Sequence, residues 1–310
     1  MAEVSKIKPS VNPEFPTIAC GSLIHNKSWA IQHHVQSIYN LDYPKENISL
    51  IFYINDSVDG TKEKLLAMLK EIKAEGKYRR VIAAEQDYGY RDLARHKRPS
   101  INQYVSRHSS PEKTVDDHAH FARVRNEWLK LREDEDYYFS IDSDVIIKQP
   151  FALRQLLEHK KDVVAIPVNN AENRSDGYDP LIETMNKFLT HPDPNVRSHI
   201  RDIHEGRVWG GAIEAEEIWN YGMIYNGALR RFKRERCLFE VDLTGACYLF
   251  KAELIENGVC YGPNYAGEDF MFCSLAKSLG YRLYVDGTLD TEHFMDFNPH
   301  EKQKEVAKIA

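Results

Sequence analysis

Residues 137–147 read YYFSIDSDVII, two apolar runs separated by Asp142, Ser143 and Asp144. Side-chain direction alternates along a strand, so two carboxylates one residue apart leave it on the same face. Left unpaired, they would repel each other and resist burial. The apolar run that resumes at Val145 indicates that the pair lies inside the fold. The alternative is a surface turn, since Asp and Ser both favour turns.

A bound cation would offset the repulsion between the two aspartates and the cost of burying their charges. Carboxylate oxygens are hard ligands of the kind that Mg²⁺ and Mn²⁺ prefer. A divalent ion that carries a pyrophosphate would therefore suit the pair. A D-x-D pattern alone is a weak signal, so the rest of the chain has to support it.

Strands and helices alternate on both sides of this stretch. Strands are predicted at residues 17–24, 48–54, 78–84, 137–141 and 162–167. Four helices are predicted between them: one that ends at 39, one that starts at 61, and two that span 117–131 and 151–159. Ser28 and Thr61 are predicted to cap the first two helices. This order predicts an α/β fold with a mainly parallel sheet and helices on both faces.

Polar residues follow several of the predicted strands directly. Asn26, Asp56 and the Asp142/Asp144 pair each stand where a strand ends. Ligands of parallel α/β sheets gather beyond the carboxyl ends of the strands. The sequence therefore predicts that these side chains converge on one site.

Two stretches of the chain are less regular. Residues 86–115 are polar. Residues 168–240 interrupt the alternation of strands and helices, and they predict an insertion of helices and loops that covers the site. Compact structure returns with a strand at 243–251, a turn at 264–267, a helix at 268–279 and a strand at 282–285. We expect a flexible lead-in at 1–15, one domain at 16–298 and a tail at 299–310.

Composition narrows the class of protein. The 310 residues include 42% hydrophobic and 28% charged residues, as in a globular protein, and the net charge of −6 leaves no footprint for nucleic acid. No stretch is long enough to span a bilayer, which predicts a cytoplasmic protein or a luminal domain without its anchor. The five cysteines are scattered and predict reduced thiols.

Six motifs occur in a characteristic order along the chain. They are 18–26, 53–61, Ala122-Arg123-Val124-Arg125-Asn126, Asp142-Ser143-Asp144, Gly267-Glu268-Asp269 and His293. This series resembles the GT-A nucleotide-sugar glycosyltransferases, especially those related to family two. The resemblance covers roughly residues 16–296 and implies a GT-A, Rossmann-like fold. It implies a nucleotide-binding half at 16–167, a lid at 168–240 and an acceptor-binding half at 241–298.

The resemblance also assigns donor residues. It implies that the loop from Ser22 to Asn26 holds the nucleoside and that Asp56 bonds the base or ribose. Arg125 and Asn126 would support the donor site, with Ser143 between the two aspartates. The donor would be a UDP-sugar, or else a GDP-sugar. For Arg125, a salt bridge to the acidic run 133–136 remains an alternative.

The metal ligands come from the same resemblance. It implies that Asp144 ligates Mn²⁺ or Mg²⁺ directly and that Asp142 contacts the ribose or the water shell of the metal. His293 would complete the metal site, since neutral imidazole is a sound Mn²⁺ ligand. The alternative for His293 is a structural role, because the chain has 13 histidines.

The reaction implied by the resemblance needs a base and an acceptor. Asp269, or else Glu268, would deprotonate the acceptor hydroxyl, which implies inversion at the anomeric carbon. Acids at the start of a helix are also explained by the helix dipole. Thr244 and Gly245 would bind the acceptor, a glycan, lipid or peptide. Trp209 and Gly210 would add an aromatic platform, unless Trp209 anchors the core of the insertion.

Two other functions compete with this interpretation. A nucleotidyltransferase on a related sheet would show a Gly-rich basic loop after the first strand, and residues 21–26 lack it. A catalytically silent carbohydrate-binding protein would not need the crowded acids at 142, 144, 268 and 269. A metal-dependent glycosyltransferase is therefore the leading hypothesis.

Overall fold

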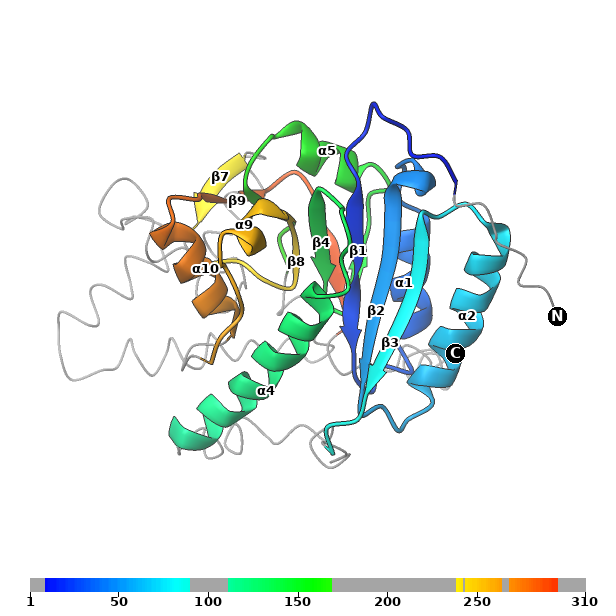
Figure 1. Ribbon diagram of the computed structural model, residues 1–310, viewed down its shortest axis with the longest axis horizontal. Helices are drawn as coiled ribbons and strands as arrows, with labels where there is room; N and C mark the ends of the chain where they lie inside the picture. The colour runs from blue at the N-terminus through cyan, green and yellow to red at the C-terminus, as the bar shows by residue number, and fades with distance from the viewer. Residues whose placement is uncertain (1–8, 90–110, 169–237, 242, 264–267, 295–310) are drawn as a thin grey trace, which may run out of the picture.

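The computed structural model describes residues 9–89, 111–168, 238–241, 243–263 and 268–294 (Figure 1). Its centre is a sheet of eight strands in the order β3-β2-β1-β4-β8-β6-β9-β7. These strands are β1 Ile18–Ile24, β2 Ile48–Asn55, β3 Arg80–Gln86, β4 Tyr137–Ile141, β6 Val163–Ala165, β7 Leu238–Val241, β8 Cys247–Lys251 and β9 Leu283–Asp286. A small antiparallel pair joins β5, Val145–Ile147, to β10, Thr291–His293.

The sheet is parallel in its first half and mixed in its second. Strands β3, β2, β1 and β4 run parallel to one another, and β6 runs parallel to β9. Strand β8 is antiparallel to both of its neighbours, β4 and β6, and β7 is antiparallel to β9. The prediction of a mainly parallel α/β sheet is therefore confirmed.

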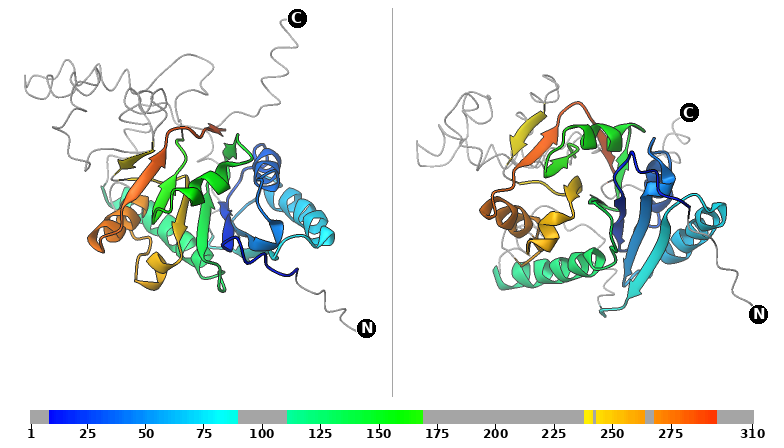
Figure 2. Two further views of the ribbon diagram at one scale, coloured as in Figure 1. Left: turned by 90° about the horizontal axis from the view of Figure 1, so that it is seen from above. Right: turned by 45° about the horizontal axis from the view of Figure 1, so that its top comes forward.

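Helices cover both faces of the sheet (Figures 1 and 2). One face carries α1 Ile31–Tyr39, α2 Thr61–Glu75 and α5 Ala152–Glu158, whose apolar residues join one hydrophobic core. The other carries α4 Pro111–Leu129, α9 Glu253–Glu256 and α10 Glu268–Ser278, which join a second core. Alternate residues of β2 divide between them, since Phe52 packs in the first and Tyr53 in the second. In the described part of the chain no helix has the length and apolarity to cross a membrane.

Both predicted helix caps are wrong. Helix α1 begins at Ile31 with Ala30 at its N-cap, and a preceding turn, in which Ala30 and Ile31 both donate to the carbonyl of Lys27, separates it from Ser28. Helix α2 begins at Thr61 itself, and the carboxylate of Asp59 accepts the Thr61 backbone N–H at 3.0 Å. Asp59 thus satisfies the donor that opens this helix.

Several boundaries also differ from the sequence prediction. The strand predicted at 243–251 begins only at Cys247, because Ala246 has a left-handed φ of 59° that interrupts the extended backbone. Thr244 and Gly245 therefore lie in the loop before β8. Strand β3 begins and ends two residues later than predicted, and α4 begins earlier, at Pro111.

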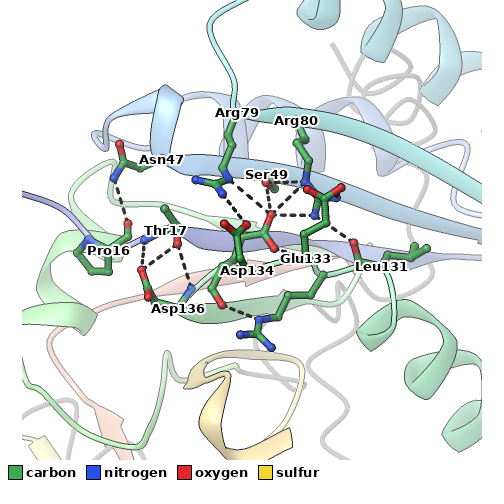
Figure 3. A network of polar contacts seen from close by, with 12 residues as sticks. Pro16, Thr17, Asn47, Ser49, Arg79, Arg80, Leu131, Glu133, Asp134 and Asp136 are labelled. Atoms are coloured by element: carbon green, nitrogen blue, oxygen red, sulfur yellow. Dashed lines mark hydrogen bonds and ion pairs between the residues drawn. The ribbon is translucent and has the colours of Figure 1, made fainter. Parts of the chain in front are cut away.

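Charged side chains tie the amino ends of the central strands together (Figure 3). Glu135, which is fully buried, accepts hydrogen bonds from Ser49 of β2 and from Arg80 of β3, the latter at 2.8 Å. Asp136 accepts from both the backbone N–H and the hydroxyl of Thr17, just before β1. These contacts hold β1, β2, β3 and the start of β4 in register at one edge of the sheet.

Candidate functional site

The predicted site residues converge at the opposite edge, beyond the carboxyl ends of β1, β2 and β4. Asn26 follows β1 and Asp56 follows β2, each with a φ of 47°. Asn and Asp tolerate this left-handed conformation better than most residues, which suits them to sharp turns after strands. The side-chain oxygen of Asn26 accepts the backbone N–H of Val58 at 2.8 Å, so it joins the two loops. Asp56 accepts the backbone N–H of Tyr88 at 2.7 Å.

Residues 142–144 form a turn that the surrounding backbone holds in place. The N–H of Asp142 donates to the carbonyl of Ala246 at 2.6 Å, and that of Phe294 donates to the carbonyl of Asp144 at 2.8 Å. The antiparallel pairing of β5 with β10 sets Val145 opposite His293. This pairing brings a histidine from the far end of the chain beside the aspartates.

Asp144 lies between a lysine and a histidine. Its Oδ2 is 2.5 Å from Nζ of Lys27, and its Oδ1 is 3.3 Å from Nε2 of His293. Burial alone would raise the pKa of the Asp144 carboxyl, but Lys27 and His293 outweigh it and hold that pKa well below its usual range. Asp144 is therefore a carboxylate at neutral pH.

Asp142 lies against a different cation, Arg125 of α4. Its Oδ1 is 3.1 Å from Nη2 of Arg125. The same guanidinium contacts Glu268 through Nε, at 2.9 Å, and Asp269 through Nη2, at 3.6 Å. The guanidinium also lies over the ring of Tyr261, with 5.4 Å to the centroid. The alternative of a salt bridge from Arg125 to residues 133–136 is wrong, because those acids bind Arg79, Arg80 and Thr17.

The charges on Arg125 and Asp142 affect each other. Burial opposes the charge of Arg125, but Asp269, Asp142 and Glu268 outweigh it and raise its pKa further. For Asp142 the balance is reversed, since burial raises its pKa more than Arg125 lowers it. Arg125 is thus fully charged, and one cation serves three carboxylates.

The acids of α10 stand at the first turn of that helix, as expected from the sequence. Glu268 and Asp269 are both buried, 9% and 7% exposed. The hydroxyl of Tyr248 donates to Asp269 at 3.3 Å. Of the two acids, Asp269 is the more distant from Arg125.

Several other predicted residues have structural partners. The side chain of Asn126 exchanges two hydrogen bonds with the backbone of Tyr261, at 2.8 and 3.0 Å. Ser143 and Thr244 are buried, and Thr244 donates its backbone N–H to the sulfur of Cys273 at 3.4 Å. Trp209, Gly210, the turn at 264–267 and nearly all of the predicted insertion at 168–240 lie outside the described residues.

Two contributors were not predicted from the sequence, Lys27 and His34. His34 is fully buried on α1, and its Nδ1 lies 2.8 Å from the carbonyl of Val145 while its Nε2 lies 2.6 Å from the hydroxyl of Ser22. A carbonyl only accepts, so Nδ1 carries the proton and Nε2 accepts from Ser22. Burial lowers the pKa of His34 to about 4. The signal for His34 was its place on the apolar face of α1, with Ile31, Val35 and Ile38.

The residues present suit a divalent cation that is held partly by protein side chains and partly by the phosphates of a bound substrate. In the described part of the chain, no group of three His, Cys, Asp or Glu side chains is placed to hold a metal. Asp144 and His293 could still supply two ligands, and the ammonium of Lys27 shows that a cation is already accommodated against Asp144. Magnesium-type sites commonly use one or two protein ligands together with substrate phosphates and water.

The charges of this edge also suit a cation. Lys27 and Arg125 are the cations in contact with Asp142, Asp144, Glu268 and Asp269 among the residues that the structure places. Among the described residues, two positive charges thus face four carboxylates. A divalent ion would restore the balance.

Comparison with known proteins places the chain in a family. The family model described as Anp1 matches residues 17–265, which include β1, the aspartates and Arg125. The chain belongs to the Anp1 family. This Anp1 family member is also similar to a protein named Glycosyltransferase 25 family member from Anopheles gambiae, 29% identical over 154 residues. These matches confirm the resemblance to glycosyltransferases that the sequence motifs indicate.

The similarity covers only part of each relative. The Anopheles match takes in 49% of this chain and 24% of the relative. Procollagen-lysine,2-oxoglutarate 5-dioxygenase 1 from Gallus gallus is 22% identical over 218 residues, which are 66% of this chain and 25% of that protein. The Anp1 family member therefore spans about a quarter of the length of the curated relatives it matches.

Two solved structures align with most of this chain. S. aureus TarS 1-349 in complex with UDP is 13% identical, with a TM-score of 0.48 over 89% of this chain and 59% of that one. The mannosyltransferase PcManGT from Pyrobaculum calidifontis, in complex with GDP-Man and Mn²⁺, is 12% identical, with a TM-score of 0.44 over 88% and 57%.

Proposed function

We propose that this Anp1 family member is a metal-dependent glycosyltransferase that moves a sugar from a UDP- or GDP-sugar to an acceptor hydroxyl. The observation that carries the proposal is the excess of carboxylates over cations that the described residues show around Asp142 and Asp144, at the edge of the sheet where α/β proteins bind ligands. A protein that bound a neutral sugar alone would have no use for this excess. The names of the relatives support the same reaction class.

The donor would lie across the carboxyl ends of β1, β2 and β4. The loops that carry Asn26 and Asp56 are joined by hydrogen bonds and would bind the nucleoside. Ser22 would act through its position in β1, since its hydroxyl is bonded to His34. Arg125 would support the donor by holding Asp142, and Asn126 by fixing Tyr261 beneath that guanidinium.

Asp144 and His293 would hold Mn²⁺ or Mg²⁺, and Asp142 would contact the ribose or the water shell. The bound ion would offset the charge that develops on the departing diphosphate. Arg125, held by three carboxylates, adds fixed positive charge beside Asp142. Preorganised charges of this kind stabilise a transition state without further rearrangement.

Asp269 would serve as the general base. It would take the proton of the acceptor hydroxyl while that oxygen forms a bond to the anomeric carbon, and the bond from that carbon to the diphosphate oxygen would break with its electron pair. Attack opposite the leaving group gives inversion. Glu268 is the second choice, because its carboxylate lies nearer to Arg125, at 2.9 Å, than that of Asp269, at 3.6 Å. Thr244, Gly245, Trp209 and Gly210 remain the proposed acceptor contacts.

A nucleotide-release assay tests the proposal. Purified protein is offered UDP- and GDP-sugars with and without Mn²⁺, and thermal shift follows binding of the same compounds. We expect metal-dependent release of UDP or GDP, and stabilisation by nucleotide and metal that Asp144→Asn abolishes. Protein that neither binds nor turns over any nucleotide sugar would contradict the proposal. Release of pyrophosphate from UTP and a sugar phosphate would instead indicate a nucleotidyltransferase.

A further inference from the structure

Lys27 has a contact that the proposed chemistry leaves unexplained. Its Nζ is 2.5 Å from Oδ2 of Asp144, the carboxylate that would bind the metal, and the two side chains are 24% and 14% exposed. The ammonium of Lys27 thus occupies one of the two carboxylate oxygens of Asp144 that would be available to the metal. The pair joins the loop after β1 to the turn after β4, 117 residues apart in the sequence.

The backbone of Lys27 is fixed, while its side chain can change partners. The backbone N–H donates to the hydroxyl of Thr61 at 2.7 Å, and the carbonyl accepts from Ala30 and Ile31. The ammonium also lies 5.2 Å from the ring centroid of Trp29. The long, flexible lysine stem lets the charge move by several ångströms without any change in the loop.

The charge of Lys27 has opposite effects on the binding of a metal ion and on the binding of a diphosphate. A divalent cation on Asp144 and an ammonium ion on the same carboxylate repel each other strongly at such short range. Metal that arrives alone must therefore displace Lys27 from its partner. Metal that arrives with a diphosphate brings new anionic oxygens, with which the ammonium can pair as it leaves Asp144.

We propose that Lys27 couples metal binding to nucleotide binding: it neutralises Asp144 in the empty site and pairs with the diphosphate in the loaded one. This inference rests on the proposed function and goes beyond it. Lys27 opposes the metal in the absence of nucleotide and favours the nucleotide in either case. The site therefore fills with metal and nucleotide together, and bare metal is held weakly.

Two binding measurements on the whole chain test the role of Lys27. Electron paramagnetic resonance of free Mn²⁺ gives the Kd for metal without nucleotide, and calorimetry gives the Kd for UDP and for GDP after metal has been removed. The variants are Lys27→Met, which removes the charge, and Lys27→Arg, which retains it. Lys148→Met is the matched control, because Lys148 pairs with Asp290 at 3.2 Å and is 44% exposed, so the same charge is lost without touching Asp144.

Opposite shifts are expected in Lys27→Met. Mn²⁺ alone should bind about tenfold more tightly than to the wild type, and UDP or GDP alone about tenfold more weakly, as couplings between sites of this kind allow. Lys27→Arg and Lys148→Met should stay within about twofold of the wild type in both measurements. If the contact of Lys27 with Asp144 were merely structural, its loss would weaken the binding of both Mn²⁺ and nucleotide, because it would loosen the loop that carries Asn26.

The outcomes separate the inference from the proposed function. Unchanged or weaker Mn²⁺ binding in Lys27→Met, or nucleotide binding that does not depend on Lys27, would overturn the inference alone, provided that the wild type binds nucleotide with Mn²⁺. A wild type that binds neither UDP nor GDP in the presence of Mn²⁺ would overturn the proposed function, and the role of Lys27 with it.

Discussion

The two edges of the central sheet both carry clusters of charged side chains, but their charges are balanced differently. The basal cluster, at the amino ends of the strands, consists of Arg79, Arg80, Glu133, Asp134 and Glu135. The site cluster, at the carboxyl ends, consists of Lys27, Arg125, Asp142, Asp144, Glu268 and Asp269. Among the described residues, the basal cluster has two cations for three carboxylates, whereas the site cluster has two cations for four carboxylates.

One buried acid from each cluster illustrates the difference. Burial opposes the charge of Glu135, but the hydroxyl of Ser49, backbone N–H groups and Arg80 outweigh it and lower its pKa. Asp142 has fewer compensating partners, and burial raises its pKa. A cluster that satisfies its own charges stabilises the fold, whereas one that does not is poised to bind something else. Variants of the two clusters test whether that division of roles is correct.

The largest expected effect is the loss of sugar transfer in a variant of the site cluster. Asp269→Asn keeps the shape of the side chain and removes its basicity, so transfer should fall by about 10²–10⁴-fold while nucleotide binding persists. Steady-state transfer and calorimetric nucleotide binding, measured on the same preparation, check this. Glu268→Gln is the control, with a smaller expected loss. Normal transfer by Asp269→Asn would show that the base assignment is wrong.

The basal cluster should respond through stability. Glu135→Ala leaves the buried hydroxyl of Ser49 without its acceptor and leaves Arg80 with Glu133 as its remaining carboxylate, so we expect the free energy of unfolding to fall by about 3 kcal/mol. Urea unfolding measures it. Asp134→Ala is the control within the same cluster, because Asp134 is 71% exposed and its pair with Arg79 contributes only about 0–1 kcal/mol. Equal losses in the two variants would contradict the structural role given to Glu135.

His34 links the site to the fold and makes stability depend on pH. Its pKa is lowered from 6.5 to about 4, so the unfolded chain takes up the proton first as pH falls. Stability should be full above pH 6.5 and should decrease by about 3 kcal/mol by pH 4 through this group. Unfolding of the wild type and of His34→Gln across this range isolates the contribution as a difference. Parallel pH profiles would refute it.

Much of this comparison was predictable from the sequence. The alternation of strands and helices placed β1, β2 and β4 correctly, and the rule that ligands gather at carboxyl strand ends brought Asn26, Asp56 and Asp142 to one edge. The acids of α10 were expected at a helix start and are found there. These predictions succeeded because they depend on local pattern and chain direction.

The pairing of individual charges was not predictable. Nearness in sequence favoured the acidic run at 133–136 as the partner of Arg125, yet its partners include Glu268, 143 residues away. Lys27 reaches Asp144 across two loops, and the start of β8 depends on the left-handed Ala246. Each of these depends on how distant segments pack, and a long side chain has many partners within reach until that packing is set.

The smallest expected effect has the opposite sign to that in the basal cluster. Asp142→Asn removes one of four crowded carboxylates and keeps an oxygen that can accept from Arg125, so the free energy of unfolding should rise by about 0.5–1 kcal/mol at neutral pH without ligand. Asp144→Asn is the matched control and should lower stability, because its charge is paired with Lys27. Urea unfolding of both variants decides the sign. If Asp142→Asn proves as costly as Glu135→Ala, the site cluster is balanced by charges elsewhere in the chain, and its excess of carboxylates no longer points to a bound cation.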